Sequence, residues 1–210
     1  MYRVADQIVE ILEKAGVKRI YGIVGDSLRR RKTIEWIHVR HEEVAAFAAS
    51  AEAQLSGNLA VCCGSSGPGN LHLINGLFDA HRNHAPVLAI ASHIPQSQVG
   101  MEYFQATHPE QLFKECSAYA ELVSEASQAP CILMSAIQHA WARRDVGVVV
   151  LPGDIADAPA EMKNLVHPPS YTRENVVPEH ESVSLLARML DDHRRITFFC
   201  GAGCAGAEDK

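Results

Sequence analysis

The strongest constraint on the fold is an alternation of helical patterns with short apolar runs along most of the chain. Residues 3–15 place Val4, Ile8 and Leu12 on one helical face and stop at Gly16, which favours a helix end. Short apolar runs typical of buried strands follow at residues 19–24, 33–39, 59–63, 86–92, 120–124 and 146–152. Helical patterns lie between them at residues 40–57, 71–82, 109–117 and 130–144. This alternation predicts an α/β fold with a parallel sheet.

The pattern closes one domain, which we assign to residues 1–158. Residues 159–178 contain four prolines, mixed charge and no periodicity, as is typical of an interdomain linker. Beyond them, residues 179–195 are predicted to form an amphipathic helix and residues 196–200 a strand that runs into glycines. We therefore expect residues 179–210 to begin a second, Rossmann-like domain.

Composition excludes several classes of function. A net charge of -6 with 19 dispersed Lys and Arg residues argues against a nucleic-acid surface. No apolar run reaches the roughly 18 residues that span a bilayer, and the acidic, amphipathic N-terminus is unlike a signal peptide, so we expect a cytoplasmic protein. The six cysteines form no CxxC pair and no HExxH motif occurs, which indicates free thiols and no metal site.

Three glycine-bearing turns follow expected strands, where a parallel sheet places its ligands. The residues of GIVGDS, at 22–27, are explained well by a helix-capping turn alone, without a ligand. GSSGPGN, at 64–70, is either a tight βα turn or a site that exposes amides at a helix N-terminus. GAGCAG, at 201–206, has the dinucleotide-binding spacing, but the acidic residue expected roughly 20 positions later would lie beyond Lys210.

Residues 38–50, HVRHEEVAAFAAS, lead two carboxylates into an apolar helix. Both sides of this helix are apolar, so both could be packed. The side with larger residues comprises Val44, Phe47, Ala48, Ala51 and Leu55, and the slim side comprises Ala45, Ala46, Ala49 and Ala53. Glu42 and Glu43 fall in its first turn, where acids offset the helix dipole by about 0.3–1 kcal/mol. Alternatively, Glu42 points into a crevice where burial raises its pKa and lets it share a proton with a ligand.

Four stretches, in this order and spacing, resemble the N-terminal pyrimidine-binding domain of thiamine-diphosphate (ThDP) enzymes: AGVKRIYGIVGDSL, RHEEVAAFAA, GSSGPGNLHLINGLFDAHRNHAPVLAI and VVVLPGD. The resemblance covers essentially the whole chain. It is closest to the bacterial pyruvate oxidases, which contain flavin, and more distant to the acetolactate synthases. It implies a six-stranded parallel sheet flanked by helices, followed by a domain that binds FAD in the oxidases through a turn matching Gly201, Gly203 and Gly206.

The resemblance also implies roles for individual residues. Glu42, rather than Glu43, hydrogen-bonds a ring nitrogen of the cofactor's aminopyrimidine and assists removal of the thiazolium C2 proton. Residues matching the two cofactor-binding turns are Val24, Gly25 and Asp26, and Gly67, Pro68, Gly69 and Asn70. Phe104 and Gln105 match a stretch that faces the substrate in relatives.

The implied reaction is oxidative decarboxylation of pyruvate, or another 2-oxo acid, to acetate and CO2, with electrons passing through FAD to a quinone. The implied assembly is a homodimer or homotetramer in which the helix at 40–57, with its slim alanine side, lies at the contact between paired subunits. Any contact with the inner face of the cell membrane would come through regions outside this sequence. An acetolactate synthase-like carboligase is the alternative within the same class of enzyme.

Two departures from the family pattern limit these expectations. Only RRRK separates Leu28 from Thr33, whereas a βαβ crossover takes roughly ten or more residues, so we expect residues to be missing there. The GDG motif through which the family's C-terminal domain holds Mg2+ and the diphosphate does not occur. We therefore expect no ThDP-dependent decarboxylation by this chain alone. A non-catalytic α/β domain that binds a nucleotide or a partner is the alternative from another class.

Overall fold

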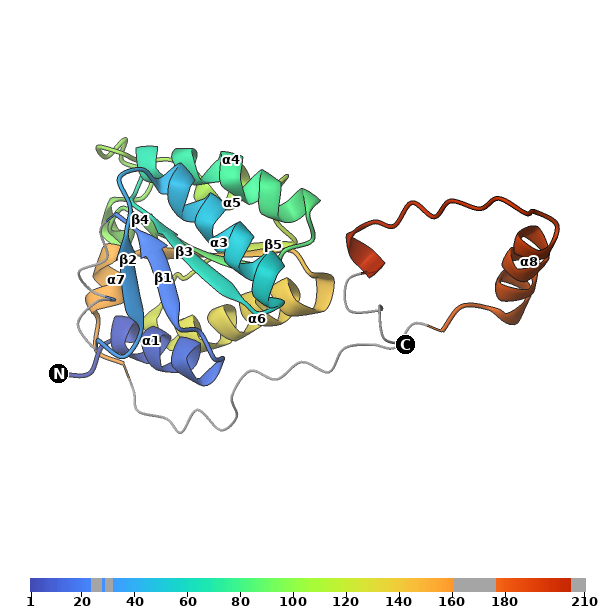
Figure 1. The fold of residues 1–210 in the computed structure, drawn as a ribbon. Helices are drawn as coiled ribbons and strands as arrows, with labels where there is room; N and C mark the ends of the chain where they lie inside the picture. The colour runs from blue at the N-terminus through green and yellow to red at the C-terminus, as the bar shows by residue number, and fades with distance from the viewer. Residues whose placement is uncertain (24–27, 29–31, 161–176, 205–210) are drawn as a thin grey trace. The chain divides into compact units, whose positions relative to one another are not determined.

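The structure, a computed structural model, describes residues 1–23, 28, 32–160 and 177–204. The chain divides into two compact units, Met1–Tyr171 and Thr172–Lys210. Figure 1 shows the first unit as a twisted sheet between two layers of helices. The predicted linker, 159–178, lies mostly outside the described residues, and the predicted domain boundaries stay predictions.

The first unit is built on a six-stranded sheet with the strand order β2-β1-β3-β4-β6-β5. The strands are β1 (Arg19–Gly22), β2 (Glu35–His38), β3 (Ala60–Gly64), β4 (Val87–His93), β5 (Tyr119–Leu122) and β6 (Val146–Pro152). Each neighbouring pair is parallel, which confirms the predicted α/β class. Because parallel strands end at one edge of a sheet, the turns that follow β1, β3 and β4 are brought to the same edge.

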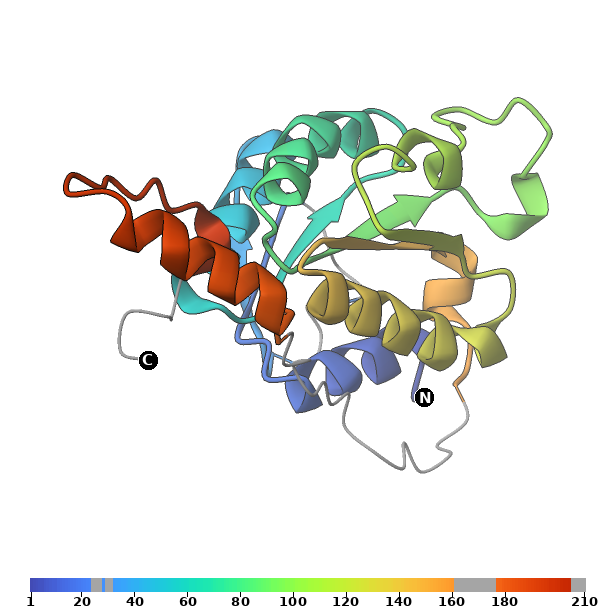
Figure 2. The same ribbon diagram turned by 90° about the vertical axis from the view of Figure 1, so that its right-hand side faces the viewer.

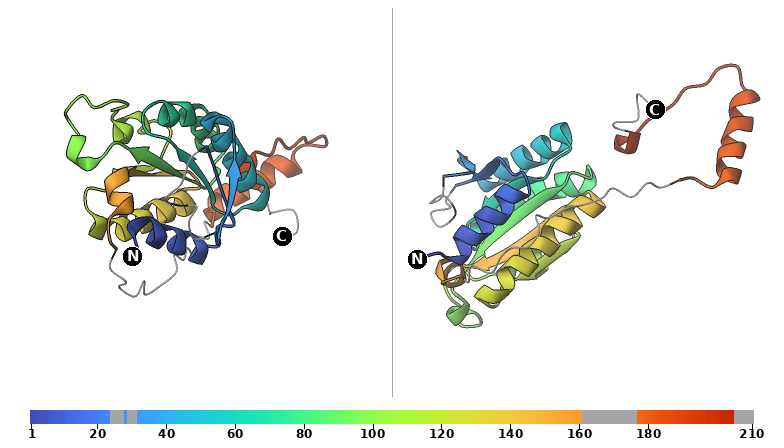
Figure 3. Two further views of the ribbon diagram at one scale, coloured as in Figure 1. Left: turned by 90° about the vertical axis from the view of Figure 1, so that its left-hand side faces the viewer. Right: turned by 90° about the horizontal axis from the view of Figure 1, so that it is seen from below.

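Helices cover both faces of this sheet, as Figures 2 and 3 show from other sides. One layer contains α3 (Glu42–Ser56), α4 (Pro68–Arg82) and α5 (Pro109–Leu112), and the other α1 (Val4–Lys14), α6 (Ala129–Arg143) and α7 (Gly153–Asp157). Along β3, Val61 and Cys63 face α1 and α6, whereas Ala60 and Cys62 face α3 and α4. Burial on both faces explains why the strands appear in the sequence as continuous apolar runs.

Several element boundaries differ from prediction. Helix α4 begins at Pro68 rather than at residue 71, because Gly67 takes a positive φ of 67° as its N-cap and proline fits the first helical position. Helix α5 ends at Leu112 and is shorter than the predicted 109–117. The five-residue helix α7 is too short to show a periodicity and was not predicted. Short 3₁₀ turns also form at Gln96–Gln98, Ala126–Gln128 and Ala202–Cys204.

The first crossover joins β1 to β2 through residues 23–34, and most of it lies outside the described residues. The two strands nevertheless pair in parallel along their whole length, from Arg19 opposite Glu35 to Gly22 opposite His38. The expectation of missing residues between Leu28 and Thr33 rested on the length of this crossover. Because most of this crossover lies outside the described residues, the expectation stays a prediction.

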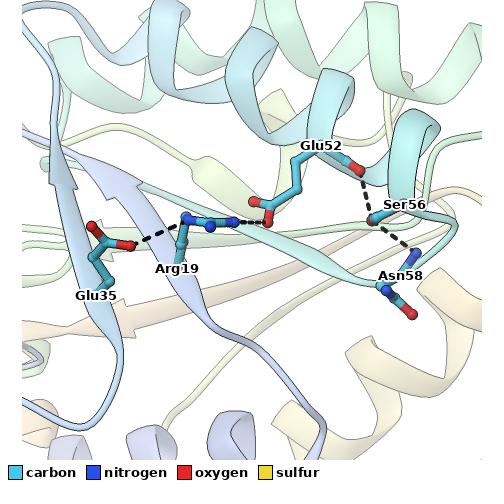
Figure 4. A network of polar contacts seen from close by, with 5 residues as sticks. All are labelled: Arg19, Glu35, Glu52, Ser56 and Asn58. Atoms are coloured by element: carbon cyan, nitrogen blue, oxygen red, sulfur yellow. Dashed lines mark hydrogen bonds and ion pairs between the residues drawn. The ribbon is translucent and has the colours of Figure 1, made fainter.

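A polar network connects β1, β2 and α3 (Figure 4). Arg19 donates from Nε to Glu35 Oε2 at 3.2 Å and from Nη1 to Glu52 Oε1 at 2.8 Å. Ser56 Oγ donates to the Glu52 carbonyl at 2.7 Å and accepts from the Asn58 backbone N–H at 3.2 Å. The hydrogen bond and charge of Glu52, followed by the charge of Glu35, raise the pKa of Arg19. Because most of these groups are exposed, the network contributes little to the stability of the fold.

The two sides of α3 are packed unequally. The slim side, Ala45, Ala46, Ala49 and Ala53, is fully buried inside the chain. The expectation that this alanine side lies at a subunit contact is therefore wrong: it packs within the domain, where small residues let two helices approach closely. The larger side carries Val44, Phe47 and Leu55, which are 53%, 39% and 90% exposed.

The second unit contains α8 (His180–Asp191), which confirms the predicted amphipathic helix but has no buried residue. The strand predicted at 196–200 does not form. A strand exists only where its backbone finds a partner, and the described part of Thr172–Lys210 contains no other strand. None of the helices within the described ranges is long and apolar enough to cross a membrane.

Gly76 allows the close approach of α4 to α3, and its substitution tests this packing. A Cβ at Gly76 would lie 2.6 Å from Ala46 Cβ and 2.7 Å from the Phe47 backbone nitrogen. Gly76→Ala should therefore lower the free energy of unfolding by about 1–3 kcal/mol, measured by denaturant titration. Arg82→Ala, at an exposed residue in the last turn of the same helix, should change it by less than about 1 kcal/mol. Equal stability of Gly76→Ala and the unmodified chain would contradict this packing.

Candidate functional site

Glu42 is the first residue of α3, at the edge of the sheet where β2 ends. His41 caps the helix, because its Nδ1 accepts the backbone N–H of Glu43 at 3.3 Å. The Glu42 side chain turns inward and is only 5% exposed. Glu43 stays partly exposed, and its carboxylate accepts a hydrogen bond from Asn75 Nδ2. Two adjacent acids are thus separated into one buried and one surface carboxylate.

Both oxygens of the Glu42 carboxylate have partners from other segments. Ser65, directly after β3, donates from Oγ to Oε1 at 2.8 Å. His72, on α4, places Nδ1 3.3 Å from Oε2. The His72 ring also stacks on the His41 ring, with centroids 4.2 Å apart and planes inclined by 25°. The carboxylate is therefore where α3, the turn after β3 and α4 meet.

The electrostatic state of Glu42 differs from the sequence-based expectation. Burial acts to raise the pKa of Glu42, but hydrogen bonds from Ser65, the Glu42 backbone N–H and His72 outweigh it and leave the pKa below its ordinary value. The expected rise is wrong for the free protein, because the carboxylate is buried among hydrogen-bond donors and not among apolar groups alone. Glu42 is therefore ionised at neutral pH and acts as a hydrogen-bond acceptor.

The predicted glycine turn at 67–70 lies against this carboxylate. A Cβ at Gly69 would overlap Ser65 Oγ and lie 2.5 Å from Glu42 Oε1, so only glycine permits the contact. Asn70 is fully buried and donates from Nδ2 to the Ser92 carbonyl at 2.7 Å, which ties the turn to β4. Its Oδ1 has no hydrogen-bond partner among the described residues. The turn is both a packed βα connection and a neighbour of Glu42.

The two predicted substrate-facing residues are placed differently from each other. Ser66 Oγ lies 3.4 Å from the Gln105 carbonyl oxygen, and a Cβ at Gly67 would lie 2.8 Å from the same oxygen. The backbone of Gln105 therefore lies beside the glycine turn. The Phe104 side chain is 82% exposed and contributes no packing there.

Other predicted site residues are not brought to this place. Val24, Gly25, Asp26 and Gly206 lie outside the described residues. Gly201 and Gly203 belong to the second unit, where a Cβ at either position would meet nothing within 4 Å. The strand and helix that should flank a dinucleotide-binding turn are not seen among the described residues of that unit. Across the described ranges, no group of three or more His, Cys, Asp or Glu could hold a metal ion.

Sequence reasoning missed Ser65 and His72. The available signal was position: Ser65 follows a buried strand directly, and His72 stands between Leu71 and Leu73 near the start of α4. Side chains on a helix lean toward its N-terminus, which directs His72 back to the sheet edge. Polar residues at these two positions could have been assigned to Glu42 once the strand order was known.

Comparison with known proteins agrees with this geometry. Residues 2–115 match the family described as "Thiamine pyrophosphate enzyme, N-terminal TPP binding domain". An "Uncharacterized 42.6 kDa protein in isoamylase 3'region" of Pseudomonas amyloderamosa is 57% identical over 99% of this chain and 54% of its own length. The pyruvate oxidase of Lactiplantibacillus plantarum is 38% identical over 70% of this chain and 26% of its own length. The chloroplastic acetolactate synthase of Arabidopsis thaliana is 29% identical over 98% of this chain and 32% of its own length.

The chain thus spans about half, or less, of the length of these curated relatives. The family match covers more than half of the chain and includes Glu42, Ser65 and the glycine turn at 67–70. The predicted sheet and the predicted family agree with the structure and with the match. The chain belongs to the thiamine pyrophosphate enzymes and carries their N-terminal TPP-binding domain.

Proposed function

We propose that this chain supplies the pyrimidine-binding half of a ThDP site, in which Glu42 exchanges a proton with the cofactor's aminopyrimidine. The observation that carries this proposal is the buried Glu42 carboxylate, in contact with Ser65 and Gly69 at the carboxyl edge of the sheet. When bound, ThDP supplies a nucleophilic carbon that attacks the carbonyl group of a 2-oxo acid and accepts the electrons left by loss of CO2.

The hydrogen bonds of Glu42 suggest how it meets the ring nitrogen. Each carboxylate oxygen has one partner, and in this proposal the ring takes the place of one of them. The His72 contact, at 3.3 Å, is longer than the Ser65 hydrogen bond at 2.8 Å, and the His72 side chain is 44% exposed. His72 therefore moves aside in this proposal and frees Oε2, while Ser65 keeps Oε1 in place.

This exchange also changes the protonation of Glu42. Loss of the His72 contact removes one of the influences that lower the Glu42 pKa, and cover by the ring deepens burial, which raises it. The carboxylate thereby passes from an ionised acceptor in the free protein to a group that holds a proton against the ring nitrogen. A general acid–base group works best when its pKa approaches the working pH.

For substrate and electron acceptor, the resemblance to pyruvate oxidases favours oxidative decarboxylation of pyruvate or another 2-oxo acid, with electrons passing to a quinone. In this version Phe104 and Gln105 face the substrate, residues of another domain hold Mg2+ and the diphosphate, and FAD contacts Gly201, Gly203 and Gly206. A carboligase resembling acetolactate synthase is the second candidate, favoured by similarity over 98% of the chain.

The exposed side of α3 suggests the partner. Val44, Phe47 and Leu55 leave apolar surface open on this helix, and Leu71 on the neighbouring α4 is 46% exposed. A second copy of the chain would cover this surface in the homodimer or homotetramer that we propose. Large exposed apolar patches commonly mark such contacts.

Substitution of Phe47 tests this assembly. Phe47→Asp would place a charge in the proposed contact and should shift the chain from dimer toward monomer in sedimentation-velocity experiments, raising the dissociation constant by roughly tenfold or more. Val99→Asp, at an exposed apolar residue elsewhere, should leave the distribution unchanged. A monomeric unmodified chain at high concentration would contradict the proposed contact.

The aminopyrimidine fragment of ThDP, 4-amino-5-hydroxymethyl-2-methylpyrimidine, tests the role of Glu42 in the chain as it stands. We expect saturable binding, followed by NMR titration, that Glu42→Gln weakens by roughly tenfold because a charge-assisted hydrogen bond is lost. Glu43→Gln, at the neighbouring surface carboxylate, is the matched control and should bind as the unmodified chain does. Equal affinity in all three proteins would remove Glu42 from the proposed role.

Ser65→Ala tests what keeps Glu42 ionised. Without the Ser65 donor the pKa of Glu42 should rise, measured from its carboxyl carbon resonance as a function of pH, whereas Ser66→Ala should not move it. A lowered folded-state pKa contributes stability that is present above the ordinary pKa of 4.5 and is lost as the pH falls through the folded value. The variant should consequently lose less unfolding free energy on acidification. An unshifted pKa would show that Ser65 is not the controlling donor.

A further inference from the structure

A cavity of about 540 Å³ lies beside the end of β4 in the first unit. Its walls come from the end of β4, the segment 94–108, α5 and β5, and neither Glu42 nor the glycine turn at 67–70 lines it. The volume is within the range of about 300–1,000 Å³ that is typical of small-molecule sites. The cavity is thus large enough for a ligand and distinct from the cofactor site.

His93, the last residue of β4, supplies a buried polar group to this cavity. Its side chain is 6% exposed, and its Nδ1 has no hydrogen-bond partner among the described residues. Burial lowers the pKa of His93, with His108 adding to this effect and Glu110 opposing it, so the ring is neutral near pH 7. A buried polar atom left without a partner costs about 1–3 kcal/mol, which a ligand that hydrogen-bonds the ring would recover.

Thr107 supplies a second such group from another part of the wall. Its Oγ1 is buried and also lacks a hydrogen-bond partner within the described ranges. Both atoms are themselves covered by neighbouring atoms, so a ligand in the cavity reaches them only after the two side chains turn toward it. Two unsatisfied polar side chains from separate elements therefore line the same space.

The segment 94–108 is fixed in place at both ends, so the cavity is preformed. Near its start, the Gln96 backbone N–H donates to Asp154 Oδ1 at 2.9 Å. Near its end, Gln105 lies against Ser66 and the glycine turn. Glu102 and Gln105 have positive φ angles of 51° and 64°, which non-glycine residues keep only where the surroundings hold them.

Charge and polarity restrict the class of ligand. The formal charges on the wall are those of Glu102 and Glu110, and the described lining residues include no Lys or Arg. An anion such as a 2-oxo acid or a phosphate would be repelled there. Ile94, Val99 and Leu122 add apolar surface for the body of a ligand.

We propose that this cavity binds an uncharged small molecule with an apolar body and one hydroxyl group, which hydrogen-bonds His93 and Thr107. The proposal does not rest on the ThDP assignment, because its residues and its ligand class are different. The segment 94–108 lines this cavity and also reaches the glycine turn through Gln105.

Phenol and benzoate, which share a ring but differ in charge, test the ligand class on the full 210-residue chain. Saturation-transfer and histidine side-chain NMR should show saturable phenol binding below roughly 10 mM, with a shift of the His93 resonances, and benzoate binding at least about tenfold weaker. Absence of saturable phenol binding, or equal binding of benzoate, would overturn the proposal.

Three variants locate the site. His93→Phe keeps the ring volume and Thr107→Val keeps the shape, and each should weaken phenol binding by roughly fivefold because one hydrogen-bonding group is lost. Ala106→Trp should fill the cavity and abolish binding. His139→Phe, at a half-buried histidine on α6 outside the cavity, is the matched control and should bind normally. If His93→Phe does not fold, Thr107→Val and Ala106→Trp decide, and normal phenol binding by both would place the probe elsewhere.

Discussion

Alanine and glycine residues let α3 and α4 pack closely over one face of the parallel sheet, and the geometry of the carboxylate site depends on this contact. Glu42 begins α3, whereas His72 lies in the first turns of α4. Because Gly76 leaves no side chain between the helices, the two N-terminal ends come close enough for His72 to contact Glu42. A bulkier contact would separate the helices and remove one partner of the carboxylate.

The same site shows how a fold can bury a charge without neutralising it. Desolvation alone would raise the pKa of Glu42, but hydrogen bonds from a hydroxyl, a backbone N–H and an imidazole outweigh this effect. These partners are not equivalent. Ser65 Oγ packs directly against Gly69, whereas the His72 side chain is partly exposed and has room to turn away from the carboxylate. The free protein therefore keeps an ionised carboxylate, whose pKa a bound ring would raise in our proposal by replacing the His72 contact.

The sheet and its layers could be predicted from the sequence, because strands buried on both faces leave continuous apolar runs such as residues 146–152. Glu42 was predicted from the family resemblance, and its burial agrees with one of the two interpretations made from the residues. The sign of its pKa shift could not be predicted, since it depends on Ser65 and His72, which are distant in sequence. The buried side of α3 was also unpredictable, because apolar size alone does not show that Gly76 lies opposite the alanines. The strand predicted at 196–200 failed for a related reason: its pattern is local, but a strand requires a partner.

Two sites of opposite character share the carboxyl edge of this sheet. Around Glu42, each carboxylate oxygen already has a hydrogen-bond partner, so a ligand there meets groups that are partly satisfied. Around His93, polar atoms lack partners within the described residues, so a ligand would gain hydrogen bonds without displacing any. The segment 94–108 separates the two and contacts the glycine turn at Gln105. Any coupling between the two sites would pass through this segment, and by linkage each ligand would then change the affinity for the other by the same factor.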